Sequence, residues 1–213
     1  MQPYLWRGDP DQAIVAFLYG RSPLFPEWAN WTLSLPGDLD LRHPKFNAHR
    51  FLYLWAVLAA HHSQDCRFFL KADPDSFVNV PAIMNVLRHL DSEVPHYLGT
   101  VVHTRSRPLG GEEDAWESFN HGLGYVLSSG ALRAAAEGLL YCVRHSARYY
   151  LDSQEDIMLG ACLGTTLQLH PRHIGHVVSS FDGSLQSFAR TLTQPPEPLL
   201  IHPVEPPAMR ALY

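Results

Sequence analysis

Length, composition and charge limit this sequence to one domain and exclude several kinds of function. Its 213 residues, 46% of them hydrophobic and 17% charged, suffice for one sizeable core and are too few for two comfortable domains, so we expect a single domain over residues 1–213. A net charge of -5 with scattered signs argues against a nucleic-acid-binding surface, which would be basic. The sequence holds no apolar window of about 18 residues, so we expect no transmembrane or targeting segment in the chain as given.

The first part of the chain predicts two strands and a helix. Residues 13–19 are a compact apolar run that stops at Gly20, which indicates a buried strand. We expect a short strand near residues 31–35 within an otherwise irregular stretch. From residue 44 to about residue 62, apolar side chains recur at helical spacing, which predicts one long amphipathic helix.

Two carboxylates one residue apart follow the next apolar run. Residues 68–70 are predicted to be a buried strand, and the chain re-enters the core at Val78. Asp73 and Asp75 are therefore expected at a strand edge, where their hard oxygen atoms suit Mg²⁺ or Mn²⁺ bridging a diphosphate. Pro74 stiffens the loop between them. The alternative interpretation is a plain turn, since Asp-Pro-Asp-Ser is also good turn chemistry.

The middle of the chain alternates predicted helices, strands and one long loop. A helix is expected from about Pro81, and a strand over residues 97–102. Residues 103–119 contain little that could pack and are predicted to form a long surface loop, of the kind that is more often functional than idle. Gly122 and Gly124 then open a strand, and residues 131–143 are predicted to be a helix. A Gly-x-Gly pair alone usually means a turn.

Three ordered blocks of this sequence resemble one family. They are Lys71-x-Asp73-x-Asp75-x-Phe77-Val78, Gly122-x-Gly124-Tyr125-Val126-Leu127-Ser128 with Ala131-Leu132, and Glu155-Asp156-Ile157-x-x-Gly160-x-Cys162. Together they are similar to the fringe and core 1 β-1,3-galactosyltransferase group, glycosyltransferase family 31. Two positions depart from its pattern, because Pro74 replaces an aspartate and His121 replaces a glycine. Without the resemblance, Glu155 and Asp156 read equally well as the acidic first turn of a helix.

The resemblance covers roughly residues 30–205 and implies a GT-A-like α/β fold with a mixed, mostly parallel sheet flanked by helices. The chain is then expected to lack the first strand and helix of the family. The implied reaction moves a hexose, foremost galactose, from a UDP-sugar to a glycan hydroxyl in β-1,3 linkage, with inversion and with Mn²⁺ or Mg²⁺. It assigns the general base to Asp156. It assigns the metal ligands to Asp73, Asp75 and His202, and the donor contacts to Lys71, Asp73, Gly122, Gly124, Tyr125 and Glu155.

Some of these assignments have alternatives in the sequence. His170, His173 and His176 compete with His202 for the metal, because the segment before His202 is longer than usual in the family. Three cysteines match no zinc pattern. The resemblance implies that two of them, Cys142 and Cys162, form a disulfide.

The resemblance also implies partners and a compartment. The expected partners are a UDP-sugar and a glycan or glycoprotein acceptor, with no nucleic acid, and a homodimer is left open. The expected compartment is the Golgi and secretory lumen, with a membrane anchor that is usual in the family but absent from this chain. A non-catalytic chaperone or glycan-binding module on the same fold is the competing hypothesis. A metal-dependent hydrolase is less well supported, since no nucleophile or histidine lies at a fitting spacing near the carboxylates.

Overall fold

The structure is a computed structural model. It describes residues 17–19, 32–34, 47–73, 76–106, 115–145, 154–178, 190–191, 196 and 198–204. Pro74 and Asp75 lie outside these ranges, as does most of the strand expected over residues 13–19.

The centre of the fold is a four-stranded mixed sheet. Its order is β3 (Phe68–Ala72), β6 (Ala115–Ser128), β5 (Tyr97–Ser106) and β7 (Arg172–His173). The expected α/β class with a mixed sheet is confirmed. The sheet is less parallel than expected, because β6 runs antiparallel to both β3 and β5 and only β7 pairs in parallel. β5 and β6 follow each other along the chain, and a direct connection between neighbouring strands gives an antiparallel pair.

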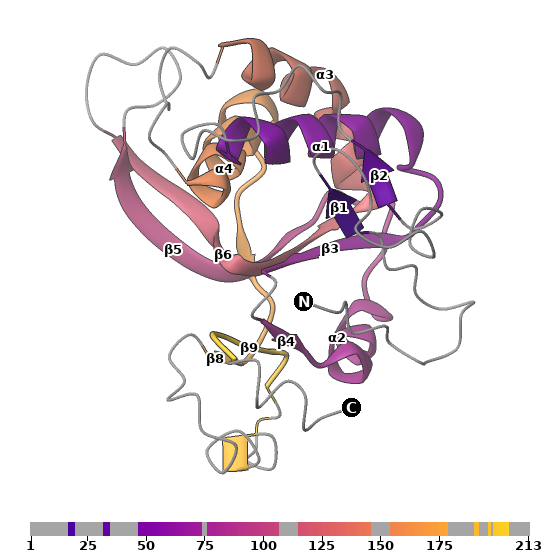
Figure 1. Ribbon diagram of the computed structural model, residues 1–213, viewed down its shortest axis with the longest axis vertical. Coiled ribbons are helices and arrows are strands. Elements are labelled where there is room, and N and C mark those ends of the chain that lie inside the picture. The colour runs from indigo at the N-terminus through magenta and orange to yellow at the C-terminus, as the bar shows by residue number, and fades with distance from the viewer. Residues whose placement is uncertain are drawn as a thin grey trace.

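The prediction of a long loop over residues 103–119 was wrong for most of that range. β5 continues to Ser106, and β6 begins at Ala115. The two strands pair from Val101 opposite Asn120 to Ser106 opposite Ala115. The pair forms a curved ribbon that projects beyond the helices (Figure 1). Each strand supplies the other's hydrogen-bond partners, so this ribbon needs no apolar alternation of the kind that marks a half-buried strand. Residues 107–114, which include the acidic trio, lie outside the described residues.

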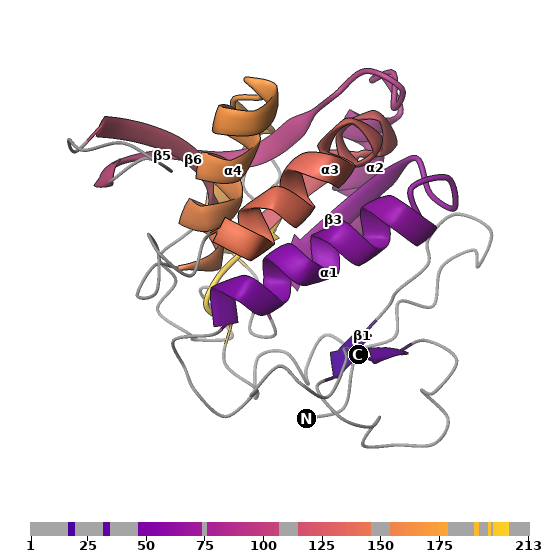
Figure 2. The same ribbon diagram turned by 90° about the horizontal axis from the view of Figure 1, so that it is seen from above.

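Three helices cover one face of the sheet (Figures 1 and 2). They are α1 (Asn47–His61), α3 (Ser129–His145) and α4 (Glu155–Leu167), and they contact one another. α1 and α3 agree with the predicted helical segments, and α4 begins at Glu155, where the acidic first turn of a helix was one of the two interpretations. The core beneath them is apolar and includes Leu52, Trp55, Tyr125, Leu132, Leu139, Met158 and Leu163.

A smaller layer lies against the opposite face. It holds α2 (Val80–Leu87) and a three-stranded sheet of β4 (Phe77–Val78), β9 (Leu200–Ile201) and β8 (Val177–Val178). Asn79 caps α2 by accepting a hydrogen bond from the Ala82 amide at 3.2 Å, and Pro81 stands in the first turn as predicted. The second apolar cluster fills this side with Ile83, Leu87, Leu98, Leu123, Val126, Leu199 and Leu200.

Two further strands precede the helices. β1 (Phe17–Tyr19) and β2 (Thr32–Ser34) pair in parallel, inside the two N-terminal segments predicted to be strands. β3 is a strand as predicted, but it is not fully buried, because Leu70 is 40% exposed. None of the described helices is long and apolar enough to cross a bilayer.

Candidate functional site

The backbone turn that follows β3 holds Asp73 at the edge of the sheet. The Ser76 amide donates to the Asp73 carbonyl at 2.9 Å, which is the i to i+3 hydrogen bond of a β-turn. The turn is fixed to β6, because the Asp73 amide and the Ser76 hydroxyl both donate to the Leu123 carbonyl, at 3.3 and 2.8 Å. The hydrogen bond between the described residues Asp73 and Ser76 agrees with the turn interpretation, which is compatible with a site. The Asp73 carboxylate keeps 35% of its surface exposed.

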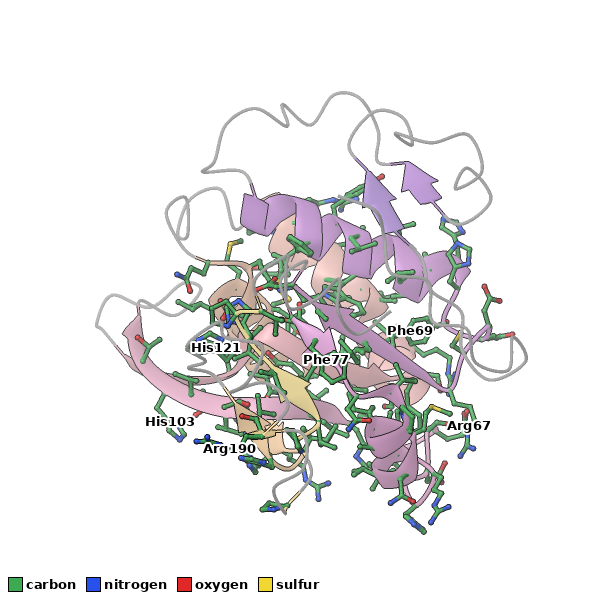
Figure 3. The ribbon with its side chains drawn as sticks, turned by 60° about the horizontal axis from the view of Figure 1, so that its bottom comes forward. Arg67, Phe69, Phe77, His103, His121 and Arg190 are labelled. Carbon is green, nitrogen blue, oxygen red and sulfur yellow. A yellow bond between two sulfur atoms is a disulfide. The ribbon has the colours of Figure 1, made fainter. Side chains whose placement is uncertain are left out.

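A bulge in β6 brings its glycine segment over the same place. The register with β5 steps from Gly99 opposite Tyr125 to Val101 opposite Asn120, so residues 121–124 stand opposite Thr100 alone. Such bulges re-aim backbone groups and are frequent beside active sites. Here the bulge turns both polar groups of Gly122 inward, where its amide donates to Asp156 and its carbonyl accepts from Lys71. His121, an exposed residue of the bulge that is labelled in Figure 3, accepts a hydrogen bond from the Leu123 amide at 3.3 Å.

A side chain at Gly122 would crowd the two carboxylates of α4. A Cβ atom there would lie 3.1 Å from Asp156 Oδ2 and 3.3 Å from Glu155 Oε1. Gly124 faces the other layer, where a Cβ atom would lie 2.7 Å from Leu200 Cδ1. The two glycines therefore serve close packing against α4 and β9 in this structure.

Lys71 is the cation at the centre of the cluster. Its side chain is buried, and its Nζ atom lies 2.6 Å from Asp73 Oδ1 and 2.5 Å from Glu155 Oε1. Burial lowers the pKa of Lys71, but the charges and hydrogen bonds of Glu155 and Asp73 outweigh it, so the pKa is raised above its ordinary value. Lys71 therefore carries its charge in the folded protein.

Glu155 is the buried anion that faces Lys71. Tyr125 donates its hydroxyl to Glu155 Oε2 at 2.8 Å and accepts from Trp55 Nε1 at 3.0 Å, which extends the network to α1. Burial raises the pKa of Glu155, and Lys71 and Tyr125 only partly oppose it. Burial and the Glu155 charge raise the pKa of Tyr125 well above its ordinary value. The phenol therefore stays protonated and acts as a hydrogen-bond donor.

Asp156 is the most enclosed of the three predicted site carboxylates that the structure describes, at 3% exposure. It stands in the first turn of α4, whose cap residue Gln154 makes no side-chain capping bond. Asp156 Oδ1 accepts from the Ile157 amide at 2.9 Å and Oδ2 accepts from the Gly122 amide at 2.7 Å. The carboxylate thus closes the helix end and ties it to the bulge. Each carboxylate oxygen has a further lone pair with which to accept a proton or hydrogen bond.

The comparison with protein families agrees with this arrangement. A model described as Fringe-like matches residues 45–194, from the start of α1 to beyond β8. The chain belongs to the Fringe-like family. Members of this family are glycosyltransferases of the secretory pathway that transfer a sugar from a nucleotide-sugar donor to a glycan acceptor.

His202 lies beyond the range matched by the Fringe-like model, but β9 places it near the carboxylate turn. β9 pairs antiparallel with β4, with Ile201 opposite Phe77, so the next residue, His202, lies beside Ser76. The rival His173 sits on β7, and β5 and β6 separate it from β3, which makes about 14 Å at the usual strand spacing. His170 and His176 are exposed on the same connection. The register therefore favours His202 over His173.

The metal site expected for a Fringe-like glycosyltransferase can be compared with the described residues only in part. Among them, no three His, Cys, Asp or Glu side chains are grouped so as to hold a metal ion, and Asp75 is not one of the described residues. Asp73 supplies a partly exposed carboxylate directly after β3, at the strand end where the metal ligands were expected. Carboxylate oxygens suit Mn²⁺ or Mg²⁺, whereas a neighbouring imidazole is typical of transition-metal sites and not of Mg²⁺ sites.

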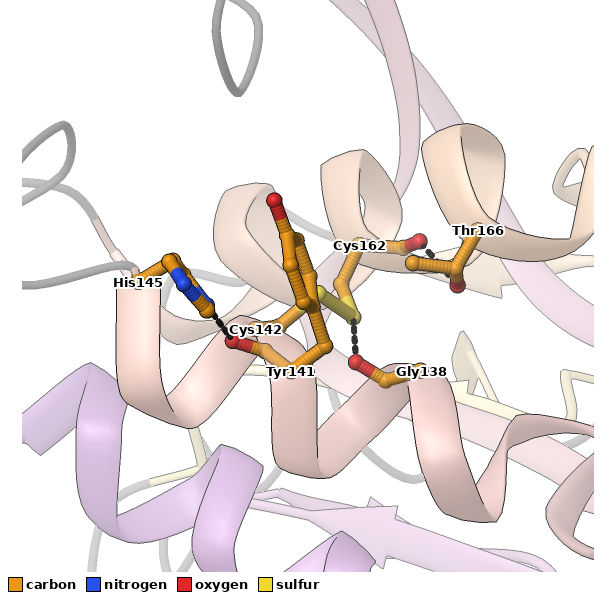
Figure 4. Close-up of a disulfide and its surroundings, with 6 residues drawn as sticks. All are labelled: Gly138, Tyr141, Cys142, His145, Cys162 and Thr166. Atoms are coloured by element: carbon orange, nitrogen blue, oxygen red, sulfur yellow. Dashed lines mark hydrogen bonds between the residues drawn. A yellow bond between two sulfur atoms is a disulfide. The ribbon is translucent and has the colours of Figure 1, made fainter.

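The implied disulfide is confirmed. Cys142 of α3 and Cys162 of α4 are bonded, with their Cα atoms 6.0 Å apart (Figure 4). Cys66 is a free, half-buried thiol, and burial followed by the charge of Asp65 raises its pKa. The disulfide thus joins the two helices behind the site.

Sequence reasoning missed three aromatic residues that support the site. Trp55 reaches Tyr125, the ring of Phe51 lies 5.3 Å from Lys71 Nζ, and the Tyr97 hydroxyl accepts from the Asn120 amide at 3.0 Å. Helical spacing had placed Phe51 and Trp55 on the apolar face of α1. Nothing in the sequence marks the polar contacts that they make with β3 and β6, because these arise only when helix and sheet pack.

Proposed function

We propose that the chain is an inverting, metal-dependent β-1,3-glycosyltransferase that moves a hexose from a UDP-sugar to a glycan hydroxyl. The observation that carries the proposal is the convergence of three segments, the end of β3, the bulge of β6 and the first turn of α4. They bring Asp73, Gly122 and Asp156 into one cluster. Family membership supplies the reaction class, and this cluster supplies the residues.

The proposed chemistry is one displacement at the anomeric carbon. The acceptor hydroxyl oxygen forms a bond to that carbon while the bond to the UDP oxygen breaks, and the hydroxyl proton passes to the Asp156 carboxylate. Attack from the face opposite the leaving group inverts the α donor to a β product. Because Asp156 is only 3% exposed, the chain that covers it has to open when the acceptor binds.

The leaving diphosphate would bind at the turn after β3. Asp73, Asp75 and His202 would hold Mn²⁺ or Mg²⁺, which offsets the charge that develops on the departing UDP. The position of His202 beside Ser76 supports this ligand set. Galactose is the first donor to test, and N-acetylgalactosamine on a protein the first acceptor, because the match over residues 124–132 is to core 1 enzymes.

Calorimetric titration of UDP tests the donor site. We expect binding with Mn²⁺ present and none with EDTA, followed by transfer from UDP-galactose in a product assay. Mg²⁺ in place of Mn²⁺ is expected to support weaker binding. Absence of UDP binding under both conditions would overturn the proposal.

The substitution Asp156→Asn tests the assigned base. It removes the proton acceptor but keeps an oxygen that can accept from the Gly122 amide, so we expect kcat to fall about 10²–10⁴-fold. The dissociation constant of UDP should stay unchanged. Asp91→Asn, at an exposed turn where the carboxylate only accepts from the Glu93 amide at 2.9 Å, is the control. Wild-type turnover in the Asp156 variant would leave that residue with a structural role alone.

A non-catalytic chaperone or glycan-binding module is the second candidate. The burial of Asp156 and the backbone amides at both of its oxygens favour it, since these contacts have a structural use of their own. The two candidates differ in one result. The module would bind a glycan or a protein partner and would form no product with any UDP-sugar.

A further inference from the structure

The ammonium group of Lys71 is matched to three oxygens from three different elements. Its Nζ atom contacts Asp73 Oδ1 after β3, the Gly122 carbonyl in the β6 bulge and Glu155 Oε1 in the first turn of α4. A lysine ammonium has three N–H groups and no acceptor. Two of these contacts are hydrogen bonds and the third is an ion pair, so oxygens of the fold itself surround the ammonium charge.

The site uses a lysine in a chain that otherwise relies on arginine. Only Lys45 and Lys71 are lysines, among 16 basic residues. An ammonium is compact and can aim its donors in three directions, whereas a guanidinium is planar and presents a fork. The rings of Phe51 and Tyr125 lie 5.3 and 5.7 Å from Nζ and restrict the space around it. The surroundings of Nζ therefore favour the compact ammonium of a lysine over the planar guanidinium of an arginine.

The contacts of Lys71 connect it in two ways to Asp156, the predicted base. Gly122 is held from both sides, since its carbonyl accepts from Lys71 while its amide donates to Asp156. Glu155 pairs with Lys71 and is covalently adjacent to Asp156. The Tyr125 hydroxyl donates to the second oxygen of Glu155 at 2.8 Å and itself accepts from Trp55 Nε1 at 3.0 Å. The position of Asp156 relative to Asp73 thus depends on one cation.

We propose that Lys71 is a positioning residue, whose ammonium fixes the carboxylate turn, the glycine bulge and the first turn of α4 relative to one another. In this role it makes no contact with the sugar donor, which differs from the donor contact that family resemblance implies for Lys71 and Glu155. The inference rests on the proposed function for its kinetic consequence. Its structural part, the coupling of the three segments, can be measured without any activity.

The test uses a pair of variants that separates positioning from stability. Lys71→Met keeps the length of the side chain but leaves Glu155 as a buried, unpaired charge, so we expect this variant to lose stability. The double variant Lys71→Met with Glu155→Gln removes both charges and keeps an oxygen for the Tyr125 hydroxyl. We expect the double variant to unfold at a denaturant concentration close to that of the wild type. The matched control is Arg133→Met with Glu93→Gln, an ion pair at the other end of the sheet.

Kinetics of the double variant give the first result. We expect kcat to fall about 10²-fold, the loss that a displacement of about 1 Å can cause, with KM for the donor within about threefold of the wild type. The control pair should keep both constants. A donor KM raised tenfold or more with kcat unchanged would mean that Lys71 contacts the donor, and wild-type constants would mean that the ion pair has no positioning role. Either result overturns the proposal.

Amide hydrogen exchange gives the second result and needs no substrate. The amides of Gly122 and Ile157, both bonded to Asp156, should exchange at least tenfold faster in the double variant, while Leu139 in α3 should be unchanged. If the wild type transfers no sugar but this local change occurs, the proposed function fails and the coupling stands. Unchanged exchange at Gly122 and Ile157 overturns the coupling, whatever the activity.

Discussion

At the scale of single residues, the site depends on the missing side chain of Gly122. A Cβ atom there would press on Asp156 Oδ2 at 3.1 Å and on Glu155 Oε1 at 3.3 Å, so Gly122→Ala has to displace the first turn of α4 by a few tenths of an ångström. We expect kcat to fall about 10- to 100-fold, while the free energy of unfolding falls by only about 1 kcal/mol.

The same substitution within α4 provides the control for Gly122→Ala. Nothing lies within 4 Å of a Cβ atom built on Gly164, so Gly164→Ala should leave kcat unchanged and stabilise the helix by about 0.5–1 kcal/mol. Kinetics and urea unfolding of both variants make the comparison. Wild-type kcat in Gly122→Ala would show that α4 can shift without loss of function.

The candidate site residues could be selected from the sequence to the extent that they sit in ordered motifs. The motifs that contain Lys71, Gly122 and Glu155 lie far apart in the chain, and the structure brings them within hydrogen-bonding or ion-pair distance as one cluster. What the motifs could not predict is which contacts each residue makes. The engagement of Lys71 with protein oxygens follows from the β6 bulge, which arises from strand register.

At the scale of elements, the disulfide between α3 and α4 is expected to contribute strongly to stability. It closes a loop with a sequence separation of 20 residues, for which the chain-entropy model gives about 3 kcal/mol. The variant Cys142→Ala with Cys162→Ala should lose about that free energy of unfolding in urea, with kcat reduced far less than in the Gly122 variant. Cys66→Ala is the control, since this thiol is half-buried and unbonded. A loss below about 1 kcal/mol would contradict the prediction.

The helices were easier to predict than the strands, and the reason is physical. A helix satisfies its own backbone, so its apolar spacing and caps, such as Asn79 before α2, are visible locally. A strand depends on its neighbours, and their identity is not local information. The ribbon of β5 and β6 was therefore missed at residues 103–106 and 115–119, and the sheet was expected to be more parallel than it is.

At the scale of the whole molecule, two apolar layers meet at the sheet, and the site lies where their supports overlap. Tyr125 belongs to the cluster under the three helices, and Leu123 and Leu200 belong to the cluster on the other face. The turn that carries Asp73 is bonded to Leu123, while the network of Lys71 reaches Tyr125. Unfolding of either layer should therefore disrupt the cluster, which ties its integrity to global stability.

The buried tyrosines should make the free energy of unfolding fall as pH rises in the alkaline range. Tyr97 is fully buried and lies edge-on to Tyr125, with ring centroids 5.7 Å apart, and burial raises the pKa of Tyr97 above its ordinary value. Above pH about 10 an unfolded tyrosine loses its proton while the folded one keeps it, so the unfolded state binds fewer protons and stability falls as pH rises. The stabilising contribution is complete below the unfolded pKa and is lost above it.

Tyr97→Phe should therefore flatten the alkaline loss of stability. Without this ionisation, the free energy of unfolding should fall less steeply above pH about 10, and the slope should differ from that of the wild type by up to about 1.4 kcal/mol per pH unit. Below pH about 10 the variant should be less stable by about 1 kcal/mol, because the Asn120 amide loses its acceptor. Urea unfolding between pH 8 and 11 measures the slope, and absorbance at 295 nm reports tyrosinate. Tyr141→Phe on the exposed face of α3 is the control. Equal slopes in the wild type and the Tyr97 variant would mean that Tyr97 ionises inside the fold, which its complete burial against Tyr125 opposes.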